Sequence, residues 1–188
     1  RSVRARELLT DLAPRILGAL AATVNPDQAL ARFDEFLEGL PVGVQLFSLI
    51  FNNPGILDIL AEIMGSAPRL AEHLSRNPQA LDGVLGHSFF GPPPAKAVLV
   101  NETERAIAGA RDLQDVLDLL RLWHRERLFQ IGVAILRQTL VGDQAGAALS
   151  DLAEAAIGTL VPRIEDIFAA RHGSVAGSGF CLIAMGRK

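Results

Sequence analysis

The chain has 188 residues, of which 49% are apolar and 21% are charged, and its mean hydropathy is +0.28. This composition supplies enough apolar material for a folded core and excludes an intrinsically disordered chain. The formal net charge of -3 gives no overall positive field, which argues against non-specific nucleic-acid binding. The single cysteine, Cys181, excludes an internal disulfide framework and fits a reducing compartment.

The first half of the chain contains repeated signals for the start of a helix. Asn or Ser can cap the amino terminus of a helix, and Pro is best tolerated in the first turn. The sequence places such residues together at Asn25-Pro26, Asn53-Pro54, Ser66-Ala67-Pro68 and Asn77-Pro78. The predicted helices span residues 3–24 (bent near Pro14), 27–38, 42–51, 55–64, 68–75 and 78–85. Short helices joined by tight turns favour an orthogonal bundle, which we expect over residues 1–85.

The apolar residues of these helices recur at helical spacing. One stripe consists of Leu30, Phe33, Phe36, Leu37 and Leu40, and another of Ile56, Ile59, Leu60 and Ile63. Between them lies the apolar group of Leu46, Phe47, Leu49, Ile50 and Phe51. We expect these residues to form the core of the bundle.

Residues 86–94 carry dense Gly and Pro and cannot continue a helix, so they predict a linker. Beyond it, the spacing of apolar residues predicts one long helix from Asp112 to Leu140. Val141-Gly142-Asp143 predicts a turn, and a second long helix follows from Gln144 to Ala170, weakened or bent by Gly158 and Pro162. Two successive long helices predict an antiparallel hairpin within residues 95–171.

The end of the chain differs from the rest. His172 to Gly179 is a Gly- and Ser-rich loop, and Phe180 to Met185 predicts a strand. A single strand is unstable, so we expect residues 172–188 to be the loop and first strand of a truncated α/β domain. The chain also begins at Arg1 without a Met, and we therefore expect a piece of a longer, mainly α polypeptide. No uninterrupted apolar run approaches the ~20 residues of a membrane span, so no membrane partner is expected.

Residues that would mark a catalytic or metal site are few. The four histidines, His73, His87, His124 and His172, lack a His or Cys partner at metal-ligand spacing. The glycines of the 172–179 loop precede a strand, whereas those of phosphate-binding loops follow one and open a helix. No Gly-x-Ser-x-Gly nucleophile motif is present. We therefore assign no catalytic and no metal-binding residue.

Two charged groups on the predicted 112–140 helix have alternative interpretations. His124-Arg125-Glu126-Arg127, beside Trp123, is either a surface for an anionic partner or a solvated helix face, and we favour the latter. Asp112, Asp115 and Asp118 lie three residues apart near the start of the helix. The helix dipole and solvation account for them without a carboxylate site.

Residues 42–85 contain the text Val-Gly-Val-Gln-Leu-Phe-Ser-Leu-Ile-Phe-Asn-Asn-Pro-Gly-Ile-Leu-Asp-Ile-Leu-Ala-Glu-Ile-Met-Gly and, after it, Leu-Ser-Arg-Asn-Pro-Gln-Ala-Leu-Asp. Together with Asn25-Pro26-Asp27 and the Arg/Glu-rich stretch from Arg121 to Leu140, this text resembles the glutamine synthetase adenylyltransferase family, also called glutamate-ammonia ligase adenylyltransferase. Phe180 to Arg187 resembles the first catalytic strand of that family and the Gly-Lys turn after it, with Arg187 where Lys is more frequent.

The resemblance implies an enzyme that transfers AMP from ATP to a tyrosine of glutamine synthetase and removes it by phosphorolysis. It implies a cytoplasmic, bacterial protein that uses magnesium and ATP and responds to glutamine and the PII signalling protein. The family's metal-binding acids follow the Gly-Lys turn, beyond Lys188, so this chain is expected to be a helical scaffold that leads into a nucleotidyltransferase domain.

Gly186 and Arg187 are the residues that the resemblance assigns to nucleotide binding. Glycine lets the backbone approach a phosphate closely, and a cation offsets its charge. An ordinary strand-to-loop turn is the alternative. For the whole chain, two other functions stay open: a regulatory module that binds PII or glutamine, and an independent helical interaction domain.

Overall fold

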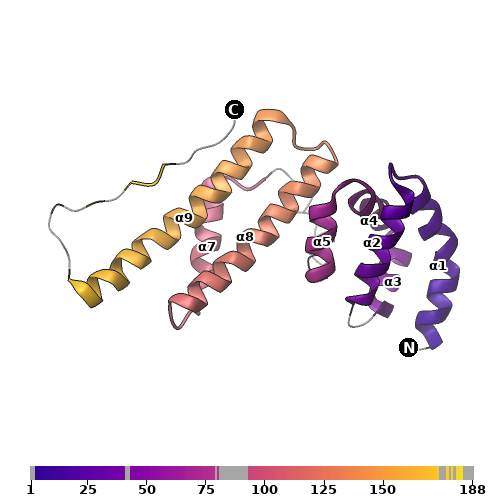
Figure 1. Cartoon of the computed structure of the whole chain (residues 1–188), viewed down its shortest axis with the longest axis horizontal. Coiled ribbons are helices and arrows are strands. Elements are labelled where there is room, and N and C mark those ends of the chain that lie inside the picture. Colours follow the sequence, from indigo (N-terminus) through magenta and orange to yellow (C-terminus); the bar gives the residue numbers. More distant parts are fainter. Residues whose placement is uncertain are drawn as a thin grey trace.

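The computed structural model describes residues 3–40, 43–78, 80, 93–173, 177, 179 and 181–183. Within these ranges the regular structure is entirely helical, and Figure 1 shows two groups of helices side by side. The mainly helical fold expected from the sequence is confirmed. Among the described residues no single helix is long and apolar enough to cross a membrane; Leu46–Asn52 and Pro54–Ser66 reach that length and hydropathy only as a pair bent by 118°.

The first group, called the first bundle below, contains five short helices within the described residues up to Asn77. They are α1 (Val3–Ala21), α2 (Pro26–Glu38), α3 (Gly43–Asn52), α4 (Pro54–Ser66) and α5 (Pro68–Arg76). Four of them lie within two residues of the predicted ranges, and α1 ends three residues earlier than expected. Pro stands in the first turn of α2, α4 and α5, where its missing N–H leaves no helical hydrogen bond unmade.

The core of the first bundle is centred on α4. Ile56, Ile59, Leu60 and Ile63, the predicted stripe, are all buried there. Phe33 and Phe36 of α2 are buried as well, with ring centroids 6.3 Å apart. Two expected core residues are instead exposed: Leu30 at 46% and Phe51 at 54%. Each lies on a helix whose buried face is already complete, so helical spacing alone assigns one residue too many to the core.

The Asn-Pro pairs act differently from the capping that the sequence suggests. Asn25 and Asn53 occupy the N-cap positions of α2 and α4, but neither side chain makes a capping hydrogen bond. The Asn53 Nδ2 donates to the Leu49 carbonyl oxygen (3.4 Å), and the Asn77 Nδ2 to the His73 carbonyl oxygen (3.0 Å). The side chains of these two asparagines therefore donate to carbonyl oxygens at the end of the preceding helix. Ala67, not Ser66, occupies the N-cap position of α5, and no side chain caps this helix.

The second group, called the second bundle, has three helices where the sequence analysis expected a two-helix hairpin. They are α7 (Lys96–Ile107), α8 (Leu113–Leu136) and α9 (Gly142–His172). Helix α7, which packs against both long helices, is not among the helices expected from the sequence. Its buried face contains Leu99, Thr103 and Ile107, spaced four residues apart. A threonine at the centre of this face weakens the apolar pattern, which explains why the helix was missed.

The turn between α8 and α9 lies earlier than predicted. The expected helix to Leu140 is wrong, because α8 ends at Leu136 and Gln138 adopts a left-handed conformation (φ 57°). The amides of Thr139 and Leu140 then donate back to the Ala134 carbonyl oxygen. In contrast, α9 runs continuously through Gly158 and Pro162 for 31 residues.

Helix α8 belongs to two cores. Phe129 and Val133 pack into the core of the first bundle, whereas Val116, Leu120, Trp123 and Ile131 pack with α7 and α9. A helix with two buried faces joins the groups in Figure 1, with α5 and α4 against one side of α8. The residues that set the relative position of the two bundles are therefore on α8.

Several predictions lie wholly or largely outside the described residues. They are most of the 78–85 helix, the 86–94 linker apart from residues 93 and 94, and Phe180, Ala184 and Met185 of the strand. Cys181 to Ile183, which are described, have no regular secondary structure. The strand and the truncated α/β domain therefore stay predictions.

Candidate functional site

The residues assigned to nucleotide binding, Gly186 and Arg187, lie outside the described part of the chain. The structure therefore leaves the proposed nucleotide turn untested. The described residues form a pocket in the first bundle, a polar network in the second bundle, and a junction between the two bundles.

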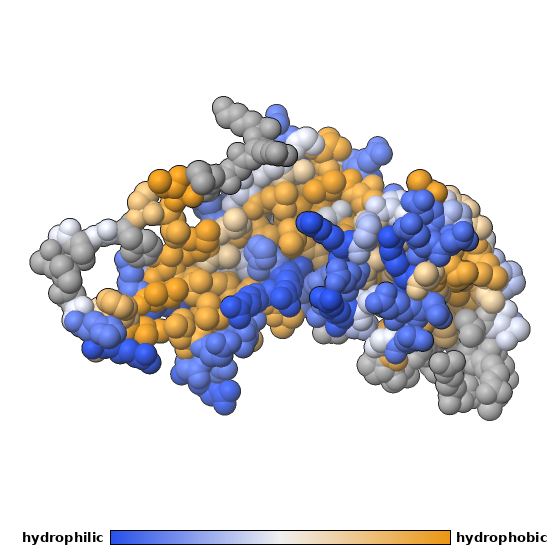
Figure 2. Space-filling model, in the orientation of Figure 1, coloured by the Kyte–Doolittle hydropathy of each residue, from blue (hydrophilic) through white to orange (hydrophobic). Residues whose placement is uncertain are grey.

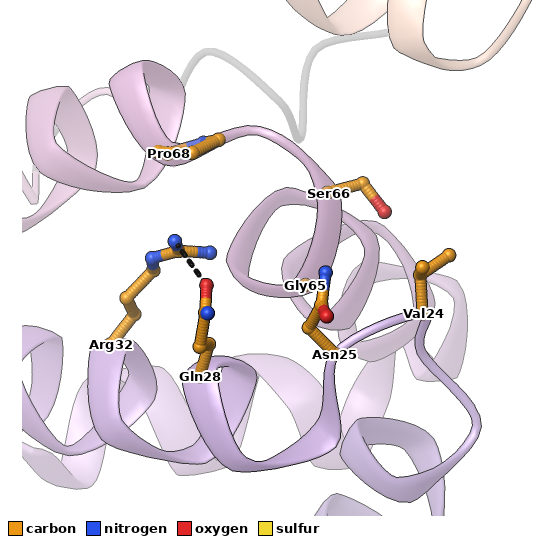
Figure 3. A pocket seen from close by; sticks show the side chains of 7 residues that line it. All are labelled: Val24, Asn25, Gln28, Arg32, Gly65, Ser66 and Pro68. Carbon is orange, nitrogen blue, oxygen red and sulfur yellow. Dashed lines mark hydrogen bonds between the residues drawn. The ribbon is translucent and has the colours of Figure 1, made fainter.

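The pocket lies between the start of α2 and the α4–α5 turn, and its volume is about 210 Å³ (Figure 3). Val24 and Asn25 come from the turn before α2, Gln28 and Arg32 from α2, and Gly65, Ser66 and Pro68 from the end of α4 and the start of α5. The sequence carries no motif for this pocket, because its lining comes from positions about 40 residues apart that only packing brings together.

Arg32 is the only cationic side chain in the lining of this pocket. Its Nη1 donates to the Met64 carbonyl oxygen (2.6 Å), and its Nη2 to the Gln28 Oε1 (2.9 Å), as Figure 3 shows for the latter. The first bond satisfies a carbonyl in the last turn of α4, which has no partner within the helix. Arg32 thus connects α2 to α4 and also supplies positive charge to the pocket.

The second bundle contains a half-buried polar network around Glu102 of α7. Arg127 Nη2 donates to Glu102 Oε1 (2.5 Å), and Trp123 Nε1 donates to Glu102 Oε2 (3.4 Å). Arg127 Nη1 also donates to Gln130 Oε1 (2.6 Å). For His124 to Arg127 the sequence offers two interpretations, a surface for an anionic partner and a solvated helix face, of which the second is favoured. Since the Arg127 guanidinium is engaged by Glu102, only Arg125 of the two arginines lies exposed.

The three aspartates near the start of α8 have structural partners. Asp112 caps the helix by accepting from the Asp115 amide (2.9 Å). Asp115 accepts from Arg111 Nε (2.8 Å), which lowers the pKa of the Asp115 carboxyl, and Asp118 accepts from Arg121 Nη1 (3.1 Å). In the structure these residues thus cap the helix or pair with arginines, which are contacts that the expected effect of the helix dipole did not include.

The described residues do not fit the magnesium ion that the resemblance implies. No group of three His, Cys, Asp or Glu side chains comes together in the described ranges. Mg²⁺ is held in proteins mainly by carboxylates and water. The carboxylates of Asp112, Asp115 and Asp118 are engaged in a helix cap and in contacts with arginines. No reaction step is therefore derived from this part of the chain.

His73 of α5 lies at the junction of the bundles, where its ring stacks on Phe129 of α8 with centroids 5.2 Å apart. Its Nε2 is buried and has no hydrogen-bond partner among the described residues. Burial lowers the pKa of His73, and the charge of Arg125 lowers it further. The neutral ring is thus favoured, which suits an apolar contact between two helices.

Comparisons with known proteins identify the family. A model described as glutamate-ammonia ligase adenylyltransferase matches residues 57–188. The chain is similar, at 43% identity over 187 residues, to proteins of Brucella suis and Mesorhizobium japonicum, and at 40% to one of Bartonella quintana. Each is named bifunctional glutamine synthetase adenylyltransferase/adenylyl-removing enzyme. The match covers 100% of this chain and 19% of each relative. The chain therefore belongs to the glutamate-ammonia ligase adenylyltransferase family.

Proposed function

We propose that this chain is a helical scaffold of an enzyme that transfers AMP from ATP to a tyrosine of glutamine synthetase and removes it by phosphorolysis. The observation that carries the proposal is the match over the whole chain to relatives named for these two opposing activities. Because the chain spans 19% of their length, the activity belongs to the longer polypeptide rather than to these helices alone.

The described geometry supports a scaffold role. Asp112 caps a helix, Asp115 pairs with Arg111, and no group of three His, Cys, Asp or Glu side chains in the described ranges could hold a metal ion. Long helices that share cores, as α8 does, hold the parts on either side of them at a defined distance. We place the first bundle at residues 1–85, the linker at 86–94, the long helices at 95–171 and the start of a nucleotidyltransferase domain at 172–188.

In this proposal the nucleotide and its magnesium ion bind outside the described residues. Gly186 would let the backbone approach a phosphate of ATP, and Arg187 would offset its charge. Glutamine synthetase is the protein substrate, PII is a regulatory partner, and the location is cytoplasmic. Membership of the family supports the proposed protein substrate, the proposed regulatory partner and the proposed location.

The test compares the 188-residue chain with the polypeptide expressed from the complete gene. Both are incubated with ATP, magnesium and glutamine synthetase, and AMP transfer is followed by intact mass of glutamine synthetase. We expect transfer by the long polypeptide and none by the 188-residue chain. Transfer by the short chain would contradict the scaffold role, and absence of transfer by the long polypeptide would contradict the enzymatic function.

A second candidate is a regulatory module that binds glutamine or PII, and the pocket of Figure 3 is the observation that favours it. Its volume of about 210 Å³ and its Asn25, Gln28 and Arg32 side chains suit a small polar ligand. Calorimetric titration with glutamine and with PII tests this role. A heat of binding that is present in the wild type and lost in an Arg32→Gln variant would support binding in the pocket. The absence of a heat of binding with both ligands would contradict the regulatory module, and the scaffold role would remain.

A further inference from the structure

An apolar surface covers the side of α8 and α9 that faces away from α7. It comprises six exposed residues: Leu128, Ile135, Leu149, Ile157, Ile164 and Phe168, which are between 39% and 62% exposed. These residues are called the α8–α9 face. In Figure 2 an apolar band crosses both long helices, and in the same orientation in Figure 1 α7 lies behind them.

Helical geometry explains why these residues form one surface. At 100° per residue, the four residues on α9 fall within an arc of about 100°, and Leu128 and Ile135 on α8 are two turns apart. The buried residues of α9, among them Leu152, Ala155 and Thr159, occupy the opposite arc. The apolar residues of the α8–α9 face therefore do not belong to the core of the second bundle.

Three ion pairs connect these helices to α7. Arg163 of α9 pairs with Glu104 of α7 (2.8 Å), Glu154 pairs with Lys96 of α7, and Arg127 of α8 pairs with Glu102. Another pair, Arg121 with Asp118 (3.1 Å), lies on α8 with Arg121 two turns before Leu128, so it borders the α8–α9 face, whereas the six residues of the face itself are apolar. Depletion of charge is typical of the centre of a permanent interface, whereas a surface for a protein that must leave is more polar.

We propose that the α8–α9 face is the docking surface for another domain of the same polypeptide, which presents an apolar helix or sheet face to it. The proposal rests on the proposed function in one respect, that the chain works as part of a longer protein. The relatives support this, because the matched region is 19% of their length.

The position of the face favours a tethered domain. Phe168 lies in the last turns of α9, so the polypeptide that leaves the helix at Gly173 starts beside the face. Leu182 and Ile183, in that following segment, are 59% and 79% exposed and also lack a covering partner among the described residues. A domain joined by a short linker has an effective concentration on the order of millimolar, so it occupies the face before a second copy or a free protein does.

Photo-crosslinking in the polypeptide expressed from the complete gene tests the proposal. A benzophenone amino acid replaces Leu128 or Ile157, and Glu126 serves as the control. Glu126 is exposed and lies two residues from Leu128, almost on the opposite side of α8. We expect at least about fivefold more crosslinking from the two face positions than from the control, to residues of the same polypeptide outside this chain. Crosslinks that join two copies, crosslinks to glutamine synthetase, or a yield equal to the control would overturn the proposal.

A charged substitution gives a second measurement. Ile157→Glu should leave the Tm of the 188-residue chain within about 2 °C, because the side chain is 44% exposed there. In the long polypeptide it should lower the Tm and the crosslinking from Leu128, whereas Ala147→Glu, also exposed on α9, should change neither. Equal effects of the two substitutions would contradict docking. AMP transfer without intramolecular crosslinks would refute this proposal and leave the proposed function intact.

Discussion

Gly65 and Gly158 are both glycines within helices, yet their surroundings differ. A Cβ on Gly65 would lie 2.4 Å from the Cβ of Thr23, which is fixed to the turn after α1. A Cβ on Gly158 of α9 would meet nothing within 4 Å. Glycine is thus required by packing at the end of α4 and merely tolerated in α9.

We expect opposite effects from the same substitution at these two positions. Gly65→Ala should lower the free energy of unfolding by about 1–3 kcal/mol through overpacking. Gly158→Ala should raise it by up to about 1 kcal/mol, because alanine loses less backbone entropy in a helix. Urea denaturation of both variants measures the difference. A Gly65→Ala variant as stable as the wild type would show that Thr23 can move aside.

His73 makes stability depend on pH. Its pKa is lowered in the folded chain, mainly by burial, so the unfolded chain binds a proton more readily. The contribution of His73 to stability is therefore complete above its unfolded pKa of about 6.5 and is lost as the pH falls through the folded pKa. His124 has a pKa lowered by burial as well and acts in the same direction.

The expected result is a free energy of unfolding that decreases between pH 7.5 and 5.5. His73→Leu keeps an apolar contact with Phe129 and removes the titrating group, so its decrease over this range should be smaller. Chemical denaturation at a series of pH values measures both slopes. The His124→Leu variant serves as a comparison, and identical slopes in wild type and His73→Leu would contradict the role of His73.

At the scale of elements, α7 is held to α9 by a polar contact inside an apolar core. Thr103 and Thr159 are 0% and 3% exposed, and their hydroxyl oxygens lie 2.6 Å apart. Thr103 Oγ1 also donates to the Val100 carbonyl oxygen (2.7 Å), which leaves Thr159 as the donor to Thr103. The Thr159 hydroxyl therefore depends on Thr103 for a buried acceptor, whereas the Thr103 hydroxyl also has the Val100 carbonyl oxygen as a partner.

A double-mutant cycle should reveal this dependence. Thr103→Val should cost about 1–3 kcal/mol, because it leaves the buried Thr159 hydroxyl without its partner. Adding Thr159→Val should recover part of that loss, since both polar groups are then replaced by methyl groups. Thermal denaturation of the two single variants and the double variant gives the coupling. Strictly additive effects would show that the two threonines contribute independently.

At the scale of the whole molecule, the two bundles meet through α8. Gly132 faces Leu70 of α5, and a Cβ at this position would lie 2.7 Å from Leu70 Cδ2. Arg137 of α8 and Glu62 of α4 add an exposed ion pair at 3.8 Å, which contributes little. The apolar contacts of Phe129, Val133 and Leu70 therefore carry the junction.

Gly132→Val should loosen this junction and uncouple the two cores. Trp123 is the single tryptophan, and it lies in the core of the second bundle, so its fluorescence reports unfolding of that bundle alone. Far-UV circular dichroism reports all helices. We expect coincident thermal transitions in the wild type and separate ones in Gly132→Val, with Gly158→Val as the matched control. Coincident transitions in Gly132→Val would mean that Leu70 rearranges to accept the larger residue.

The short helices of the first bundle could be predicted because their signals are local. Proline fixes the first turn, and the stripe from Ile56 to Ile63 follows the helical period and is buried throughout. The end of α8 could not be predicted in this way, since the left-handed conformation of Gln138 has no signal in its residue type. The contact of Asp112 is predictable from the sequence, because the cap joins two residues that are three apart in the chain. The contact of Arg127 is not, because its partner Glu102 lies on another helix.

The sequence by itself determined the helical class, most helix starts and the family resemblance, since each depends on residues close together in the chain. Only the tertiary structure decided that α7 completes a three-helix bundle, that α8 contributes to two cores, and that Gly65 and Gly132 lie close to the side chains of Thr23 and Leu70. It also decided that Leu128 and Ile157 are exposed, although their apolar character suits a core equally well. The physical reason is that burial depends on how many helices pack around a residue, which local spacing does not specify.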